Sequence, residues 1–537
     1  MLLVPGRNLC YICRMIREQL RELIGKAIAQ EYGLKDIPQF GIVASDRPEH
    51  GDYATNVGLV LARVLKKPPL EIANALNYIM LHTGQDIVGR TEVAAPGFIN
   101  VWILPQLLHK ELGVVLKQKA RYGMLAIGGK KKAQVEFISA NPTGPLTVAN
   151  ARGGPFGDVI AAVLEHAGWR VTREYYVNDA GAQIEALGHS VLGDDKAQYR
   201  GAYIDDLRRR IKGKNPEKIG RRAAAIILTH IKKTVEKGMG IRMDVWFSER
   251  SLHDAGTIDA LLGRLRAKDL AYEKDGALWF RASRFGDSED RVLVKSDGAK
   301  TYFAGDFAYH ENKFAVRKFD RVINVWGADH HGDVMRLMAA AEILRSREKL
   351  TILLTQFVRV VQGGEALRMS KRRGVFVTAD KLLAEVGRDA FRFFFLMSSA
   401  DTHIDFNIDL AKERSLKNPV YYVQYAHARI AGILNRAPRA PRTADFSLLA
   451  APEELALIKK MAQFPELIED TARDYQVHRI PRYAMDLARA FHAFYEIHRV
   501  VSDDKRLTAA RIGLVRGAQT VLGETLRILG VAAPKKM

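Results

Sequence analysis

The stretch "EFISANPTGPLTVANARGG", residues 136–154, decides the fold. It begins as an apolar strand, runs into a turn that contains Pro142, Gly144 and Pro145, and continues as a helix. A strand, a turn and a helix in this order are typical of segments that hold a phosphate group. The stretch contains no histidine or lysine, so it is either a nucleotide site built from unusual residues or the remnant of one.

Strands and helices alternate on both sides of this stretch. Helices follow at "GDVIAAVLEHAG" and in a long segment that ends near "GRLRAKDL". The other strand-like segments are "WRVTREYYVND", a hairpin of "ALWFRAS" and "DRVLVKS", then "RVINVWGAD" and "LTILLTQFVRVV". Short apolar strands separated by helices predict an α/β fold with a doubly wound, Rossmann-like parallel sheet. Ligands bind beyond the carboxyl ends of such strands, which is where "NPTGP" and "GADHHGD" fall.

The flanking regions differ from this central part. A helix from Met15, a strand in "PQFGIVAS", two helices separated by Pro68 and Pro69, and a closing strand "TEVAAPGFINVWI" predict a small α/β unit. Near the carboxyl terminus strands disappear, and a helix with Asn418 as N-cap and Pro419 in its first turn opens an all-α bundle. The predicted boundaries are 1–14 for a non-native start or extension, 15–105 for the amino-terminal domain, 106–412 for the sheet domain and 413–537 for the bundle.

Composition limits the class of protein. A chain of 537 residues is too long for one core, and its net charge of +21 favours a polyanionic partner such as nucleic acid. No apolar run reaches the ~18 residues of a membrane span, so we expect a soluble, cytoplasmic protein. Cys10 and Cys13 form a lone CxxC, a weak signal for metal or redox work. Residues 1–14 have two competing interpretations: translation starts at Met15, or these residues are a short targeting peptide. The segment lacks the apolar stretch and cleavage site that are typical of such a peptide.

A second element fits a phosphate. No GxxxxGK[ST], no complete GxGxxG after a strand and no HExxH is present, which excludes P-loop enzymes and ordinary dehydrogenases. Residues 366–378, "ALRMSKRRGVFVT", carry Arg368, Lys371, Arg372 and Arg373 beside glycines. Such a cationic loop can close over a polyphosphate and stabilise the leaving group, or it can be a solvated basic turn.

Together the two elements resemble the HIGH and KMSKS signatures of class I aminoacyl-tRNA synthetases, with "RMSKR" at 368–372 as the second. The surrounding sequence resembles the bacterial type of arginyl-tRNA synthetase over residues 15–537. The segments that carry this resemblance are "SANPTGP", "TREYYVNDAGAQI", "DVWFSERSL", "TYFAGDFAYHENKF", "NVWGADHHGDVMRL" and "NPVYYVQYAHARI". The resemblance implies activation of L-arginine by ATP, with Mg²⁺ arriving with ATP, and transfer of the arginyl group to the terminal adenosine of tRNA(Arg).

The resemblance also implies site residues. For catalysis these are Thr147, Asn150, Arg368 and Lys371, and for ATP binding Pro142, Gly144, Ala149, Asn150, Gly327, Asp329, His330, Met369, Ser370 and Lys371. For arginine binding they are Glu136, Ser139, Asn141, Glu249, Tyr302, Asp306 and His330, in which paired carboxylates suit a planar guanidinium. For tRNA binding they are Tyr421, Tyr425, Phe494, Tyr495, His498, Arg499 and Met537. Tyr421 and Tyr425 also have the four-residue spacing of helical core positions.

One departure affects the chemistry. The family has His-Val-Gly-His where this chain has Thr147, Val148, Ala149 and Asn150. An Asn amide can donate to phosphate as an imidazole does, and a Thr hydroxyl can do so at shorter reach. We therefore expect an active ligase, with a catalytically silent tRNA-binding paralogue as the alternative. A nucleotidylyltransferase is the third reading, and it leaves the helical bundle unexplained.

A metal site is a further alternative. Asp329, His330, His331 and Asp333 have the composition of a metal site, but the resemblance places this segment beside ATP and arginine and implies no structural zinc. The family places the anticodon on the bundle and the tRNA elbow on the amino-terminal domain. We expect a monomer without a membrane anchor. The sequence leaves open the isoacceptor preference and whether activation requires tRNA.

Overall fold

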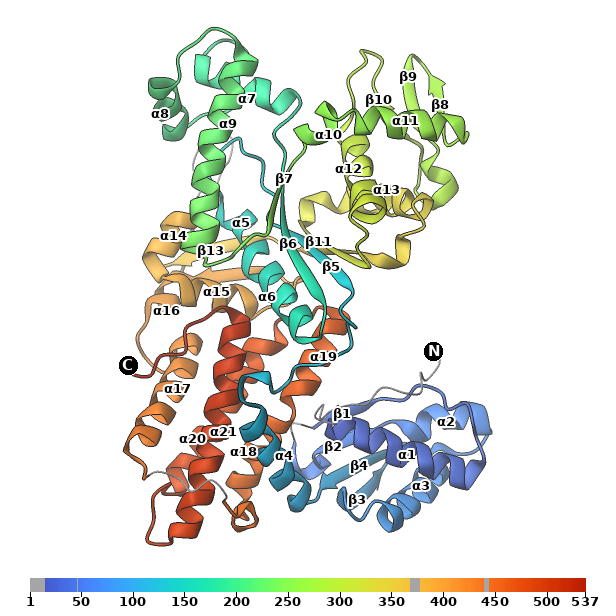
Figure 1. Ribbon diagram of the computed structural model, residues 1–537, viewed down its shortest axis with the longest axis vertical. Helices are drawn as coiled ribbons and strands as arrows, with labels where there is room; N and C mark the ends of the chain where they lie inside the picture. The colour runs from blue at the N-terminus through green and yellow to red at the C-terminus, as the bar shows by residue number, and fades with distance from the viewer. Residues whose placement is uncertain (1–14, 46, 368–376, 439–443) are drawn as a thin grey trace.

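The computed structural model describes residues 15–45, 47–367, 377–438 and 444–537. The predictions for residues 1–14, and those for Arg368, Met369, Ser370 and Lys371, therefore lie outside the described residues. The chain is elongated: a small amino-terminal unit and a helical bundle lie at one end, and two lobes rise from a parallel sheet at the other (Figure 1).

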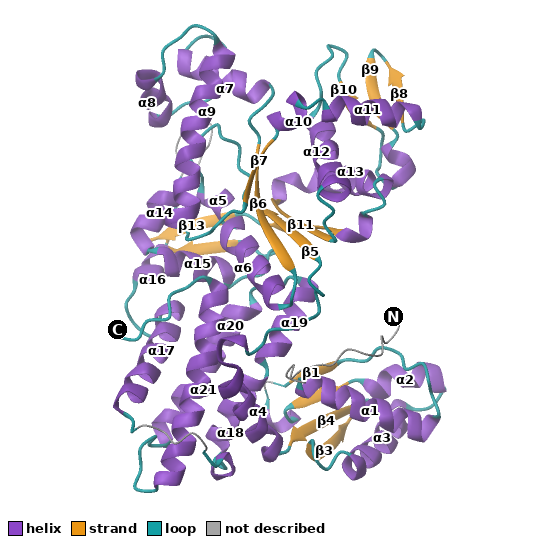
Figure 2. Ribbon diagram, in the orientation of Figure 1, coloured by secondary structure: helices purple, strands orange, loops and turns teal. Residues whose placement is uncertain are grey.

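The amino-terminal unit is a four-stranded antiparallel sheet with three helices packed against it (Figure 2). Its strand order is β1-β2-β4-β3, and its elements are α1 (Ile16–Tyr32), β1 (Ile42–Ala44), β2 (Tyr53–Thr55), α2 (Val57–Leu65), α3 (Pro69–Thr83), β3 (Val88–Ala94) and β4 (Phe98–Ile103). Helices α2 and α3 part at Pro68, as predicted. The single closing strand was wrong, because Pro96 and Gly97 turn the chain and its two halves pair antiparallel.

The amino-terminal unit is fixed to the bundle by buried charges. Arg17 of α1 forms ion pairs with Glu469 and, at 2.8 Å, with Asp470, both in α19 (Phe464–Asp474). The Tyr53 hydroxyl donates to Glu466 Oε1 at 2.9 Å. Burial raises the pKa of Glu466 to about 7. A buried charge is stable only when it is paired, so this contact specifies how the unit docks.

The central sheet confirms the predicted doubly wound α/β fold. Its five strands are parallel, in the order β12-β11-β5-β6-β7. They are β5 (Lys132–Phe137), β6 (Arg170–Val177), β7 (Val245–Ser248), β11 (Arg321–Gly327) and β12 (Leu350–Thr355). The chain winds outward from β5 to β6 and β7, then returns to the other side at β11, so the strand order reverses between β5 and β11. A crevice at the carboxyl ends of these two strands is therefore expected to bind ligands.

Helix α6 (Gly153–His166) connects β5 to β6 and covers the sheet. A Cβ at Gly157 would lie 2.3 Å from Cγ of Phe137, so only glycine permits this close packing of helix on strand. The four-residue helix α5 (Val148–Ala151) precedes α6 and carries the second half of the stretch that decides the fold.

Two insertions form the lobes above the sheet (Figure 1). Between β6 and β7 lie α7 (Ala182–Leu192), α8 (Ala202–Arg210) and α9 (Pro216–Lys233). Between β7 and β11 lie α10 (Arg250–Asp254), α11 (Thr257–Ala267), the sheet β8 (Ala271–Lys274), β9 (Ala277–Phe280) and β10 (Arg291–Val294), and α12 (Tyr302–Glu311). This second lobe shares a separate hydrophobic core with α13 (His331–Ile343). Strand β7 was missed in the sequence, where it was included in a helical stretch.

"LTILLTQFVRVV" is two strands rather than one. After β12 the chain leaves the sheet, and β13 (Val358–Gln362) pairs in parallel with β15 (Ile404–Asn407) and antiparallel with β14 (Glu365–Ala366). The buried Arg152 guanidinium donates to the Gln356 carbonyl at 2.5 Å and to the Ser399 carbonyl at 2.7 Å. These bonds hold the chain at the point where it changes sheet.

The carboxyl-terminal part is all-α, as predicted. Helices α14 (Ala379–Val386), α15 (Arg388–Leu396) and α16 (Ile408–Lys412) lead into α17 (Pro419–Arg436), α18 (Pro452–Ala462), α19, α20 (Arg479–Ile497) and α21 (Lys505–Leu529). The Asn418 side chain accepts from the Val420 amide, which confirms the predicted cap. Helix α4 (Pro105–Gln118) joins the amino-terminal unit to β5 and packs on α18 and α21. Within the described part of the chain, no helix is long and apolar enough to cross a membrane.

Candidate active site

The crevice begins with a strained turn directly after β5. Ile138 and Ser139 have φ values of 70° and 41°, in the left-handed region that β-branched residues rarely adopt. Ser139 Oγ accepts from the Tyr176 amide at 3.1 Å and donates to Glu136 Oε1 at 3.3 Å. Strain of this kind persists only where the surroundings enforce it, and it is concentrated at functional sites. Here the turn follows the carboxyl end of β5 and holds Ser139 beside Glu136.

Carboxylates from three elements meet in this crevice. They belong to Glu136 of β5, Glu249 before α10 and Asp306 of α12. Burial and the Glu249 and Glu136 carboxylates raise the pKa of Asp306 to about 8. Burial and the Asp179 carboxylate raise the pKa of Glu249 to about 7. Such a cluster is poised for a cationic ligand, because a positive charge would relieve both the burial and the repulsion.

The Glu249 carboxylate leaves an acceptor free. Its side chain is 7% exposed, and its Oε2 atom has no hydrogen-bond partner among the described residues. The Tyr176 hydroxyl hydrogen-bonds the same carboxylate. A Cβ at Gly305 would lie 3.3 Å from Glu249 Oε1, so glycine in α12 allows the carboxylate to lie against the helix. A buried carboxylate oxygen without a donor is the atom that a guanidinium would satisfy.

Two of the residues predicted to bind the guanidinium, Glu249 and Tyr302, line a cavity of about 750 Å³ between the two lobes. Asp179 and Lys300 line the same cavity. Tyr302 is 58% exposed and lies one helical turn before Asp306. The structure therefore brings the predicted residues Glu249, Tyr302 and Asp306 to one place.

Thr147 and Asn150 form a closed pair at the start of α5. The Thr147 hydroxyl donates to the side-chain oxygen Oδ1 of Asn150 at 2.6 Å and accepts from the backbone N–H of Asn150 at 3.4 Å. The side-chain oxygen of Asn150 is thereby engaged, so the Nδ2 group on the other side of the same planar amide is directed away from the Thr147 hydroxyl. Ala149 is exposed beside it. In the preceding turn, Gly144 allows close approach of Tyr203, whose hydroxyl would lie 3.3 Å from an added Cβ.

The end of the cationic segment reaches the same place. The Val148 amide donates to the Val377 carbonyl at 3.1 Å, and the Ala379 amide donates to the Leu146 carbonyl at 2.8 Å. These backbone bonds tie the residues that follow "RMSKR" to the residues beside Thr147. The described end of the second predicted phosphate element thus lies beside the first element, although more than 200 positions separate the bonded residues in the sequence.

The third predicted segment lies where β11 ends. A Cβ at Gly327 would lie 2.4 Å from Asp329 Oδ1, so glycine permits the turn there. Asp329 and His330 are exposed, and His330 Nδ1 lies 3.1 Å from Asp333 Oδ2. In the part of the chain that is described, no group of three or more His, Cys, Asp or Glu side chains could hold a metal ion.

The arrangement of the chain agrees with known families. Residues 18–103 match the arginyl tRNA synthetase N-terminal domain, and residues 111–207 and 206–394 match the class I (R) tRNA synthetase catalytic domain. Residues 423–537 match the DALR anticodon binding domain.

The chain belongs to the arginyl-tRNA synthetase family. It is 44% identical to the arginine–tRNA ligase of Desulforamulus reducens over 94% of each chain. It is 42% identical to that of Caldanaerobacter subterraneus over 98% of this chain and 100% of the relative. The Thermus thermophilus arginyl-tRNA synthetase structure superposes with a TM-score of 0.80 at 24% identity, covering 97% of this chain and 100% of that one, and so shares the fold.

Aromatic residues of α17 and α20 form a partly exposed cluster. The rings of Tyr421 and Tyr425 stack at 6.4 Å on one face of α17. The Arg429 guanidinium lies 5.1 Å from the Tyr425 ring and 4.9 Å from the Tyr495 ring. The three tyrosines are partly exposed, and stacked aromatic and guanidinium planes are surfaces on which unpaired bases stack.

The other residues predicted to bind tRNA are less uniform. Phe494 is fully buried, so its ring packs in the core and does not belong to that surface. His498 Nε2 lies 3.0 Å from Glu453 Oε2, whereas Arg499 and Met537 are exposed. The sequence places Phe494 and Tyr495 side by side on one helix, and it does not show which of the two aromatic rings points into the core.

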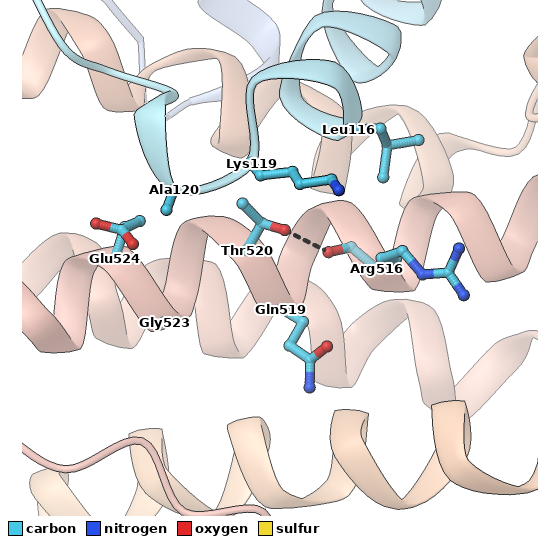
Figure 3. A pocket seen from close by; sticks show the side chains of 8 residues that line it. All are labelled: Leu116, Lys119, Ala120, Arg516, Gln519, Thr520, Gly523 and Glu524. Carbon is cyan, nitrogen blue, oxygen red and sulfur yellow. Dashed lines mark hydrogen bonds between the residues drawn. The ribbon is translucent and has the colours of Figure 1, made fainter.

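A groove on the helical bundle is separate from the crevice described above. A groove of about 400 Å³ lies between the end of α4 and α21, and Lys119 and Arg516 line it with Gln519 and Thr520 (Figure 3). The Thr520 hydroxyl donates to the Arg516 carbonyl at 3.0 Å. None of the lining residues comes from the central sheet or its insertions, so this groove takes no part in the crevice.

Several residues beneath the crevice were missed in the sequence. The buried ones are Glu174 of β6, Asn324 of β11, and Tyr309, His310 and Lys313 in and after α12, and the half-buried ones are Tyr176 of β6 and Arg317. The Tyr309 hydroxyl and the Arg317 guanidinium both donate to the Glu174 carboxylate, the latter at 2.5 and 2.9 Å. The helical spacing of Asp306, His310 and Lys313 was the signal that could have found part of this network.

Proposed function

We propose that this chain is an arginine–tRNA ligase. It activates L-arginine with ATP to arginyl-adenylate and transfers the arginyl group to the 3′-terminal adenosine of tRNA(Arg). The observation that carries this proposal is the meeting of Glu249 and Asp306 in one crevice, with a Glu249 oxygen left unpartnered among the described residues. Membership of the family, with relatives named arginine–tRNA ligase along nearly the whole chain, supports the reaction class.

The carboxylates of Glu249 and Asp306 bind the guanidinium, and the Tyr302 ring closes one side of it. A planar guanidinium with five donors matches two carboxylates better than an ammonium does, which favours arginine over lysine. Glu136 and Ser139 receive the α-ammonium group. Asn141 and His330 complete the contacts to the α-carboxylate end.

The reaction needs no enzyme nucleophile. An arginine carboxylate oxygen attacks the α-phosphorus of ATP, forming the acyl phosphate bond while pyrophosphate leaves. A ribose hydroxyl of the tRNA then attacks the acyl carbon, and AMP leaves. The protein accelerates both steps by holding the reactants in line and stabilising charge on phosphate.

ATP is placed by the turn at Pro142 and Gly144, by Ala149, and by the strand end at Gly327, Asp329 and His330. The Asn150 amide donates to a phosphate oxygen, with Thr147 holding it in place. Arg368, Met369, Ser370 and Lys371 close over the phosphates and neutralise the leaving pyrophosphate. Mg²⁺ would arrive with ATP and would help to neutralise the charge on its phosphates.

Residues 15–105 meet the tRNA elbow, residues 106–412 carry the chemistry, and residues 413–537 read the anticodon. Tyr421, Tyr425 and Tyr495 stack on unpaired bases, and His498, Arg499 and Met537 contribute polar contacts at their edge. The protein acts in the cytoplasm, where tRNA is charged for translation, and it acts as a monomer.

The test is charging of total tRNA with radiolabelled arginine, ATP and Mg²⁺, because a tRNA-free assay could miss tRNA-dependent activation. The parent is compared with Asn150→Ala and Lys371→Ala. Loss of one charged hydrogen bond to phosphate predicts a ~10- to 100-fold slower rate for Asn150→Ala. A parent that binds tRNA yet transfers no arginine at any enzyme concentration would establish the silent paralogue instead.

A further inference from the structure

A fully buried lysine lies beneath the crevice. Lys313 Nζ donates to Glu136 Oε2 at 2.6 Å and to Asn324 Oδ1 at 2.9 Å. Its ammonium also lies 4.2 Å from the centre of the Tyr309 ring. Burying an ammonium is costly unless it is paired and hydrogen-bonded, so a lysine at this position needs these partners.

The helix geometry directs Lys313 to this place. Asp306, His310 and Lys313 follow one another at helical spacings of four and three residues, so they share the face of α12 that covers the sheet. Lys313 lies in the π-helical turn η5 (Asn312–Val316) that continues α12. Such turns are frequent at functional sites.

The hydrogen bonds around Lys313 allow one assignment. The Asp306 carbonyl can only accept, so His310 Nδ1 donates to it at 2.7 Å. Burial lowers the pKa of His310 well below its usual value, so the ring is neutral and Nε2 accepts from Asn324 Nδ2 at 2.9 Å. The Asn324 oxygen therefore faces Lys313. A continuous chain of bonds joins Glu136, at one end of the arginine site, to the backbone of Asp306, at the other.

We propose that Lys313 is a positioning residue that orients the Glu136 carboxylate toward the α-ammonium group of the bound amino acid. Lys313 occupies Oε2 of Glu136, which leaves Oε1, with only a 3.3 Å bond from Ser139, to accept from the substrate. Without Lys313, the Glu136 carboxylate would lose its partner at Oε2 and would turn away from this orientation. This inference rests on the proposed arginine binding.

The proposal makes a distinction between ligands. Arginine carries an α-ammonium group, whereas 5-guanidinopentanoate is the same molecule without it. Both present a guanidinium to Glu249 and Asp306. A residue that acts only through Glu136 should therefore affect the binding of arginine and leave the binding of 5-guanidinopentanoate unchanged, whereas general damage to the fold should weaken both.

The experiment measures binding of both ligands to the full chain by calorimetry. Loss of a hydrogen bond between charged groups predicts roughly 10- to 100-fold weaker arginine binding by Lys313→Met. Binding of 5-guanidinopentanoate should stay within about twofold of the parent. Arg317→Met is the matched control, since Arg317 pairs with Glu174 in the same network but has no bond to Glu136, and it should not discriminate between the ligands.

A second pair of variants keeps the test open if Lys313→Met does not fold. Lys313→Met combined with Glu136→Gln removes both charges of the buried pair, which costs less stability than removing one. The double variant should bind both ligands as Glu136→Gln alone does. Equal loss of both ligands in Lys313→Met, or a further loss in the double variant, would overturn the role of Lys313. A parent that neither binds arginine nor charges tRNA would instead overturn the proposed function.

Discussion

Arginine binding should release protons and weaken as the pH falls from 8.0 to 6.5. In the empty crevice the pKa is about 7 for Glu249 and about 8 for Asp306. The guanidinium binds ionised carboxylates, so the free protein must lose these protons before it can bind arginine. The pKa of the guanidinium exceeds 12, so the ligand end does not titrate in this range.

The magnitude follows from the two pKa values. Between pH 8.0 and 6.5 the ionised fraction of Asp306 falls about 16-fold and that of Glu249 about fourfold. The dissociation constant should therefore rise about 16-fold if only Asp306 is coupled to binding and about 60-fold if both are, or ~1.6 to 2.4 kcal/mol.

Titration calorimetry in buffers of different ionisation enthalpy measures both quantities. At pH 7.0 about 1.4 protons should be released for each arginine bound. Asp306→Asn leaves only Glu249 to titrate, so its pH dependence should shrink to about fourfold. A parent affinity that changes less than twofold over this range, with no proton release, would refute the assignment of Glu249 and Asp306 to the guanidinium.

Three further perturbations test the packing around this site. Gly305→Ala places a Cβ 3.3 Å from Glu249 Oε1 and should raise the KM for arginine about three- to tenfold, with kcat and Tm nearly unchanged. An unaltered KM in steady-state charging would show that the close contact between Gly305 and Glu249 does not matter for arginine binding. Gly157→Ala should lower the free energy of unfolding by ~1–3 kcal/mol, because its Cβ would lie 2.3 Å from the Phe137 ring. Gly432→Ala, whose Cβ would meet no described neighbour within 4 Å, should instead raise the free energy of unfolding, and denaturant unfolding measures both changes. Arg17→Ala should cost ~1–3 kcal/mol by leaving the half-buried carboxylates of Glu469 and Asp470 without their partner, and small-angle scattering should show the amino-terminal unit released from α19; an unchanged scattering profile and Tm would count against that contact.

The sequence predicted the sheet because its strands are apolar and are separated by helices, a pattern that packing in a doubly wound sheet requires. It missed β7, whose four residues are too few to show a period beside long helices. It also joined β12 and β13, since alternation along a strand cannot show that the chain leaves one sheet for another. Both failures concern edges, where tertiary contacts decide the structure.

The site divides in the same way. Residues that we propose to touch a ligand, such as Asn150 and Asp306, lie in short local patterns of the sequence. Residues that orient them lie far away: Lys313 is 177 positions from Glu136, and only folding brings their side chains together. Phe494 shows the converse error, because an aromatic residue in a predicted surface helix gave no sign that it points into the core.

The pair of Thr147 and Asn150 bears on whether a synthetase can work without the histidines of its first signature. An asparagine has a donor and an acceptor on one rotatable group, so alone it presents either to a phosphate, and the acceptor would repel it. The 2.6 Å bond from the Thr147 hydroxyl occupies the acceptor and turns the donor outward. The backbone bonds at Leu146 and Val148 then hold this donor beside Val377 and Ala379, which follow "RMSKR" in the sequence. An imidazole depends on a partner in the same way, because the hydrogen bond at one ring nitrogen sets whether the other donates. Under the proposed function, threonine at position 147 and asparagine at position 150 therefore act together, one orienting the amide and the other donating to phosphate.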